Sequence, residues 1–174
     1  MKRVIKSLNE MSFELPDSYR LLEDKYSLSN GQGFINTENY LSGNGKVVSF
    51  FEIHRQPDEF VKYYTSLTKK YKADFEGVEL AKNFTLKVGG YRCPVFIIKG
   101  CREPQMYIFQ IFIDCGDCMG CFTVSIDEFD DDIKTLIDKN PILQELIDIM
   151  RSVQWKSCCY IVAVAHAVHR LLTF

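Results

Sequence analysis

The stretch YIFQIFIDCGDCMGCFTVSID, residues 107–127, decides the fold. Two apolar runs rich in aromatic and β-branched residues flank the segment GDCMG, residues 116–120, which has the length and glycine content of a hairpin bend. In the second run, alternation places Phe122, Val124 and Ile126 on one face and Cys121, Thr123 and Ser125 on the other. The pattern predicts two antiparallel strands joined by a bend that carries thiols.

Cys115, Cys118 and Cys121 are spaced three residues apart in this stretch, and the spacing allows two interpretations. A zinc site needs a fourth ligand, which Cys93, Cys101 or a histidine would have to supply. An iron–sulfur sequence would continue with a further cysteine and a proline, whereas FTV follows here. We therefore favour thiols carried by a turn and expect no metal or cofactor. A thiol-based metal-binding or redox protein is the alternative.

Strand patterns continue outward from this hairpin. The segments MSFEL, KVVSFFEIH, KNFTLKV and YRCPVFIIKG predict strands, and a weaker strand precedes the turn Ser42–Gly45. Gly89 and Gly90 predict a tight turn between two of these strands. Pro94 indicates an edge strand or a strand start, because proline cannot donate to a ladder.

Two helical regions complete the order. Pro57 suits a first helical position, and Phe60, Tyr64, Leu67 and Tyr71 then lie on one helix face. A second region runs from Phe129, and Asn140 followed by Pro141 restarts it with an N-cap and a first-position proline. The order β-β-β-α-β-β-β-β-α predicts an α+β fold, an α/β/α sandwich with a mostly antiparallel sheet of six to seven strands flanked by helices.

Length and composition bound the class of protein. A chain of 174 residues fits one domain, here residues 1–155, followed by an extension at 156–174. A net charge of −2 without any basic block argues against a nucleic-acid partner. The N-terminal sequence MKRVIKSLNE lacks the apolar core of a signal peptide, so we expect a cytoplasmic protein with reduced thiols.

Other residue groups have structural interpretations that we prefer to functional ones. Asp127, Glu128, Asp130, Asp131 and Asp132 do not have the spacing of a calcium loop, whereas acids are favoured at a helix start. His54 ends a strand and has no nucleophile near it in sequence. No catalytic motif is present, and we expect no enzyme activity.

The apolar extension, residues 156–174, contains SCCYIVAVAHAVHRLLTF and is predicted to be helical. His166, His169 and Arg170 interrupt it, and it is too short to predict a membrane span. It could dock on the domain, contact a partner or a membrane surface, or be foreign to the ancestral domain. His166 and His169 could bind a metal together with Cys158 and Cys159, but small apolar residues favour a packing helix.

The chain resembles the superfamily of PsbP-like, DcrB-like and Ran-binding Mog-like proteins. The resemblance covers about residues 11–155 and rests on SFELPDSY, VVSFFEI, FTLKVGGYRCPVFIIKG, the hairpin stretch and ILQELIDIMRSVQW. It implies an antiparallel sheet flanked by helices. Members assist nucleotide release from a small GTPase, support a photosynthetic complex or chaperone secreted effectors, and they share no catalytic residues. The resemblance therefore implies a non-enzymatic module that binds a protein partner of unknown identity through an aromatic-rich sheet face or groove.

Overall fold

The computed structural model describes residues 2–5, 11–22, 26–30, 33–54, 78–100, 105–114 and 118–155. The predicted hairpin lies inside its main sheet as β9 (Tyr107–Asp114) and β10 (Cys118–Ile126). These strands are antiparallel, and their register runs from Met119 opposite Asp114 to Ile126 opposite Tyr107. The predicted hairpin is confirmed.

The second strand of this hairpin begins earlier than predicted. Residues 116–120 were expected to form it, but β10 already begins at Cys118. Met119 and Gly120 pair with Asp114 and Ile113. The Met119 side chain is fully buried, and burying it stabilises an extension of the strand over an open turn. Positions 118–120 of the predicted bend therefore belong to the strand.

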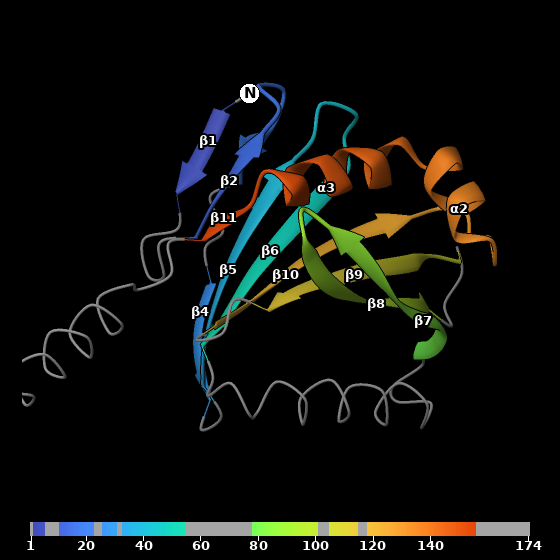
Figure 1. The fold of residues 1–174 in the computed structure, drawn as a ribbon, viewed down its shortest axis with the longest axis horizontal. Coiled ribbons are helices and arrows are strands. Elements are labelled where there is room, and N and C mark those ends of the chain that lie inside the picture. The colour runs from blue at the N-terminus through green and yellow to red at the C-terminus, as the bar shows by residue number, and fades with distance from the viewer. Residues whose placement is uncertain are drawn as a thin grey trace, which may run out of the picture.

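The main sheet places this hairpin between two others (Figure 1). Its strand order is β3-β5-β6-β10-β9-β8-β7, with β4 also paired to β5. The further strands are β3 (Arg20–Leu21), β4 (Tyr26–Asn30), β5 (Gly33–Leu41), β6 (Val47–His54), β7 (Val78–Val88) and β8 (Tyr91–Gly100). Every neighbouring pair in this order is antiparallel, which confirms the predicted α+β class and antiparallel sheet.

The tight turn predicted between β7 and β8 is also confirmed. Gly89 and Gly90 have φ angles of 57° and 91°, and Val88 pairs with Tyr91 on either side of them. Two central residues with positive φ match the twist of antiparallel strands. Pro94 lies inside β8, where it pairs with Thr85 of β7, and the pairing of β8 with β9 begins only at Val95. The proline thus sits near the strand start, where it interrupts no ladder with β9.

A second, smaller sheet has the order β1-β2-β11. Its strands are β1 (Lys2–Ile5), β2 (Met11–Leu15) and β11 (Gln154–Trp155). Of the strands in this smaller sheet, only β2 is predicted from the sequence, and β1 and β11 are not. In the main sheet, β3 and β4 are also not predicted. Strands of two residues are too short for a visible alternation, and KRVI and YSLSN contain few large apolar residues.

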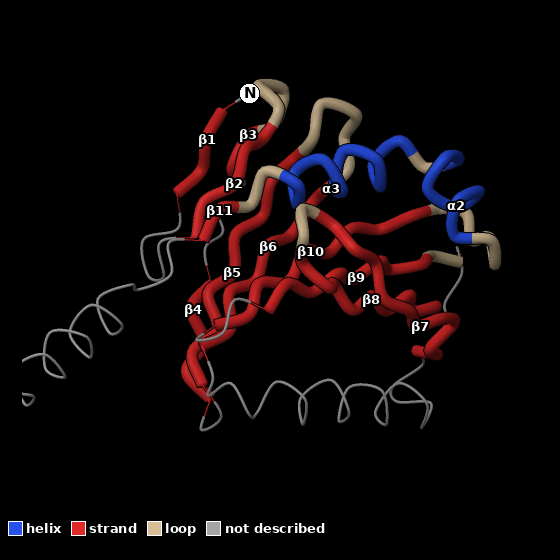
Figure 2. Tube along the Cα trace, in the orientation of Figure 1, coloured by secondary structure: helices blue, strands red, loops and turns tan. Residues whose placement is uncertain are grey.

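Two described helices, α2 (Ile133–Lys139) and α3 (Pro141–Arg151), lie on one side of the sheet (Figure 2). Asn140 ends α2 and begins α3, as the sequence predicts. The predicted apolar stripe is buried: Leu143, Leu146, Ile147 and Met150 lie in α3, and Val153 follows the end of the helix. The helix predicted from Pro57 lies outside the described residues, and so does the extension 156–174.

Both faces of the main sheet carry buried side chains. On the face covered by α3, Phe13 of β2 packs against Phe50 and Phe122, with ring centroids 5.1 and 5.2 Å apart, and the latter two rings are 4.9 Å apart. On the opposite face, Phe96 and Phe112 form an edge-to-face pair at 5.6 Å and are also buried. Aromatic rings are therefore buried on both faces of the main sheet.

Gly120 allows β2 to approach the main sheet closely. A Cβ atom at this position would lie 2.9 Å from Ile113 Cγ2, 3.0 Å from Met11 Cε and 3.3 Å from Phe50 Cε2. These distances are shorter than ordinary carbon–carbon contacts, so the space above Gly120 is already filled. The glycine is required by packing, because it lies within a strand and not in the predicted bend.

We predict that Gly120→Ala lowers the free energy of unfolding by about 1–3 kcal/mol, the usual cost of overpacking a core. Urea denaturation followed by circular dichroism measures the change. The control is Gly100→Ala, because a Cβ there would meet only Met106 O at 3.4 Å. Equal stability of the two variants would contradict the proposed packing role of Gly120.

Candidate binding site at the end of the sheet

Two of the three cysteines of the predicted hairpin, Cys118 and Cys121, are positions of β10. Cys115 lies outside the described residues, and Cys118 begins β10 opposite His54 of β6. Cys121 lies three residues further along the strand, opposite Phe112 and Phe51. Positions three apart in a strand belong to opposite faces, so the strand separates position 118 from position 121.

The Cys121 thiol lies in an apolar environment. It is 3% exposed, and its nearest polar partner is Thr123 Oγ1 at 3.6 Å. Burial raises the pKa of Cys121 to about 12, so the thiol stays protonated near neutral pH. Cys93, considered as a fourth ligand, belongs to the core on the α3 side of the sheet, opposite to the face of Cys121. Within the described ranges no three His, Cys, Asp or Glu residues are arranged to hold a metal ion.

We predict that Cys93 and Cys121 react with iodoacetamide at least 100-fold more slowly in the native protein than in urea, because only an accessible thiolate is a nucleophile. Peptide mapping by mass spectrometry measures each rate between pH 7 and pH 9. Cysteines labelled in the native state at the rate of a free thiol would contradict this burial.

The acidic run after β10 is largely neutralised by lysines from different elements. Asp127 pairs with Lys46 at 2.6 Å, Asp130 with Lys139 at 3.0 Å and Asp131 with Lys82 at 3.7 Å. The last acid of the run, Asp132, caps the N-terminus of α2: its Oδ1 accepts a hydrogen bond from the backbone N–H of Thr135 at 2.7 Å. The predicted role at a helix start is thus confirmed for this residue.

Two of these contacts shift the pKa values of the acids. The hydrogen bond from Lys139 holds the pKa of Asp130 below its ordinary value and raises the pKa of Lys139. The hydrogen bond from the backbone N–H of Thr135 lowers the pKa of Asp132. Both carboxylates are therefore charged and already engaged near neutral pH.

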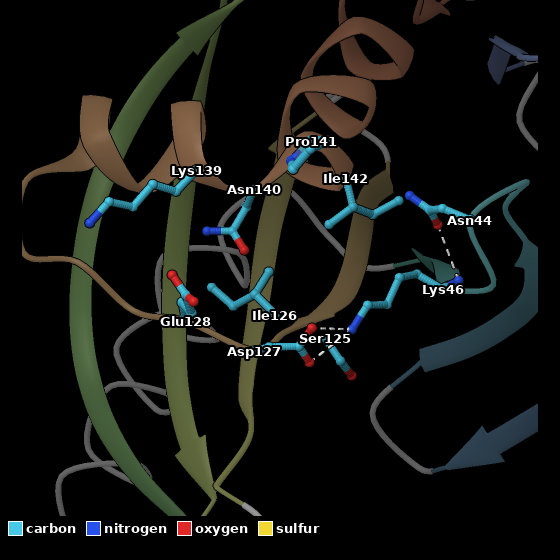
Figure 3. Close-up of a pocket in the computed structure, with 10 residues that line it drawn as sticks. All are labelled: Asn44, Lys46, Ser125, Ile126, Asp127, Glu128, Lys139, Asn140, Pro141 and Ile142. Atoms are coloured by element: carbon cyan, nitrogen blue, oxygen red, sulfur yellow. Dashed lines mark hydrogen bonds and ion pairs between the residues drawn. The ribbon is translucent and has the colours of Figure 1, made fainter.

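An open cavity of about 280 Å³ lies beside this run, where β10 ends between the β5–β6 turn and the α2–α3 junction (Figure 3). Its apolar part consists of Ile126, Pro141 and Ile142. Its polar part consists of Asn44, Lys46, Ser125, Asp127, Glu128, Lys139 and Asn140. Small-molecule and side-chain sites commonly combine an apolar body with a few polar groups in this way.

The polar side chains of the cavity differ in whether they have partners. Lys46 Nζ donates to both oxygens of Asp127, at 2.8 and 2.6 Å, and Figure 3 shows this pair at one side of the cavity. Lys139 is held by Asp130, which does not line the cavity. Glu128 has no ion-pair partner among the residues that the structure describes.

The same end of the sheet carries exposed apolar side chains. Among the described residues, the exposed large hydrophobic side chains are Leu21, Val47 and Met106, at 44%, 41% and 44%. Leu21 lies opposite Tyr40 near the end of β5, Val47 begins β6, and Met106 directly precedes β9. All three therefore lie at the end of the sheet where Ile126 lines the cavity.

Sequence patterns do not reveal this site. Lys46 and Asp127 are 81 residues apart and meet only because β6 and β10 are neighbours in the sheet. Single exposed charges in a turn are ordinary for a soluble domain. The available signal is the pair Asn140–Pro141, which correctly marks the junction that forms one side of the cavity.

No family model matches the chain, and the search of characterised proteins found no match. Solved structures do resemble it. A protein of Bacteroides thetaiotaomicron aligns with a TM-score of 0.57 and 9% identity over 90% of this chain, which spans only 48% of that protein. Cyanobacterial PsbP from Synechocystis aligns with a TM-score of 0.55 and 10% identity over 89% of this chain and 92% of its own length.

A third structure, LpqN, is involved in cell envelope biogenesis of Mycobacterium tuberculosis and aligns with a TM-score of 0.39 and 11% identity over 90% of this chain and 91% of its own. This similarity is too low to support an argument. The resemblance to PsbP-like proteins is thus confirmed for the fold. In the described part of the chain, no helix has the length and apolar character needed to cross a membrane.

Proposed function

We propose that the chain is a non-enzymatic module that binds a protein partner through the cavity end of its main sheet. We call this region the sheet-end surface and define it as Leu21, Val47, Met106 and the residues that line the cavity. The single observation that carries the proposal is that the exposed large apolar side chains of the described residues all lie here. Apolar surface gathered around a cavity with a polar rim is typical of an interaction site.

The strand order sets the width of this surface. Two strand steps separate β3 from β6, and two more separate β6 from β9. Neighbouring strands lie about 4.8 Å apart, so Val47 stands roughly 10 Å from Leu21 on one side and from Met106 on the other, and Leu21 and Met106 are roughly 20 Å apart along the rim. Leu21 belongs to the sheet face of Tyr40 and Val47 to the other face, so a partner would enclose the rim.

The aromatic anchors expected from the sequence are replaced in this proposal by aliphatic ones. The described aromatic side chains are buried or half-buried, and Phe13, Phe50, Phe96, Phe112 and Phe122 are at most 3% exposed. A partner cannot reach these rings without unfolding the core. Val47 and Met106 are accessible without any rearrangement.

A binding role without catalysis is supported by the state of the reactive groups. Lys46 and Lys139 of the cavity are engaged in ion pairs, and Cys121 is buried as a protonated thiol. Catalysis usually needs a nucleophile beside a base or a group with a pKa tuned toward neutrality. A cytoplasmic location is part of the proposal and is supported by the free thiols of Cys93 and Cys121.

A sandwich architecture is likewise proposed. It is supported by the burial of Phe96, Phe112, Met119 and Cys121 on the sheet face away from α3. Such burial requires a layer on that face.

The test of the proposed function is partner capture by the 174-residue chain. We expect that Val47→Asp combined with Met106→Asp reduces recovery of a stoichiometric partner at least tenfold, because a charge at a desolvated contact is costly. Thr85→Asp, at an exposed position on β7, is the matched control and should retain the partner. Circular dichroism and urea midpoints confirm folding of both proteins.

Unchanged capture by the Val47/Met106 variant would overturn the sheet-end surface as the binding region. An enzymatic activity that the unmodified chain shows and the Val47/Met106 variant loses would overturn the non-enzymatic role.

A further inference from the structure

We infer that the cavity of the sheet-end surface receives one basic side chain of the partner, an arginine or a lysine. This inference rests on the proposed function and names the chemistry of the contact. It starts from the apolar side of the cavity, where Pro141 is exposed and provides the accessible apolar floor next to Ile126 and Ile142, which are only 1% and 4% exposed. The methylene stem of a basic side chain gains free energy by lying on such a floor while its charged head stays near water.

The charge balance of the cavity favours a cationic head group. Lys46 is neutralised by Asp127, and Lys139 is neutralised by Asp130. Glu128 forms no ion pair among the described residues, but it acts electrostatically on Lys139, which Asp130 already binds. Two ammonium groups thus face three carboxylates, those of Asp127, Asp130 and Glu128, and the excess of one negative charge attracts a cation and repels an anion.

A second acceptor lies beside Glu128. Asn140 Nδ2 donates to Leu136 O at 2.8 Å, which fixes the amide and leaves Oδ1 as its acceptor. Figure 3 shows the Asn140 amide and the Glu128 carboxylate turned toward the same space beside Ile126. A guanidinium group presents several donors in one plane and an ammonium group presents three, so either head group can donate to more than one acceptor.

The lysines of the cavity do not favour the opposite ligand. An anion would have to displace Asp127 from Lys46, which holds both carboxylate oxygens within 2.8 Å. It would also approach Glu128. A cation meets neither obstacle, and its volume is compatible with a cavity of about 280 Å³.

The probe for this site is N-acetyl-arginine methylamide, titrated into the isotope-labelled 174-residue chain and followed by NMR. We expect saturable shifts of the Ile126, Asn140 and Ile142 signals. N-acetyl-citrulline methylamide has nearly the same shape without the charge and should bind at least tenfold more weakly. Glu128→Gln should weaken arginine binding about tenfold, the loss of one hydrogen bond between charged groups. Glu79→Gln on β7 is the matched control and should leave binding unchanged.

Equal binding of the arginine and citrulline probes, or arginine binding that Glu128→Gln leaves intact, would overturn the inference. Partner capture separates it from the proposed function. Capture lost with the Val47/Met106 variant but retained with Glu128→Gln would reject the basic side chain and keep the sheet-end surface. If Glu128→Gln abolishes arginine binding but retains partner capture, the cavity binds a small cationic ligand. That result would overturn the partner as the source of the cation.

Discussion

The packing of β2 onto the main sheet is the contact on which the rest of the structure depends. Phe13 lies against Phe50 and Phe122, and Gly120 leaves room for this approach. The backbone N–H of Glu14 in the same strand donates to Ser152 Oγ at 2.7 Å and so fixes the C-terminal end of α3. The position of α3 then sets its first residues beside the end of β10. The cavity therefore owes its shape to a contact at the other end of the helix.

Much of this architecture follows from the sequence because the periodic signals are strong. The β9–β10 hairpin, the Gly89–Gly90 turn and the α3 stripe each combine a hydrophobic period with punctuating residues. The error at Gly120 has a physical cause: a glycine that permits close packing is the same letter as a glycine that permits a turn. The short strands escape prediction because pairing with neighbours, and not local preference, makes them extended.

The candidate site is far less visible in sequence than the fold. The cysteine spacing attracts attention, yet a strand places every third residue on the opposite face and thereby separates positions 118 and 121. The acids after β10 resemble a cation site in composition, but their lysine partners come from distant segments. Glu128 differs from Asp127, Asp130 and Asp131 in forming no ion pair with a described residue, and no sequence pattern records that difference.

The pairing of Trp155 with Met11 has a practical consequence for engineering. It brings the last described strand beside β2, and Met11 Cε reaches the space above Gly120. Gly120 and Ile126 are six residues apart in β10, which corresponds to about 20 Å along an extended strand. A fluorescent reporter or immobilisation handle inserted between residues 155 and 156 would therefore attach at the end of β2 and β11 that lies away from Ile126 and the cavity.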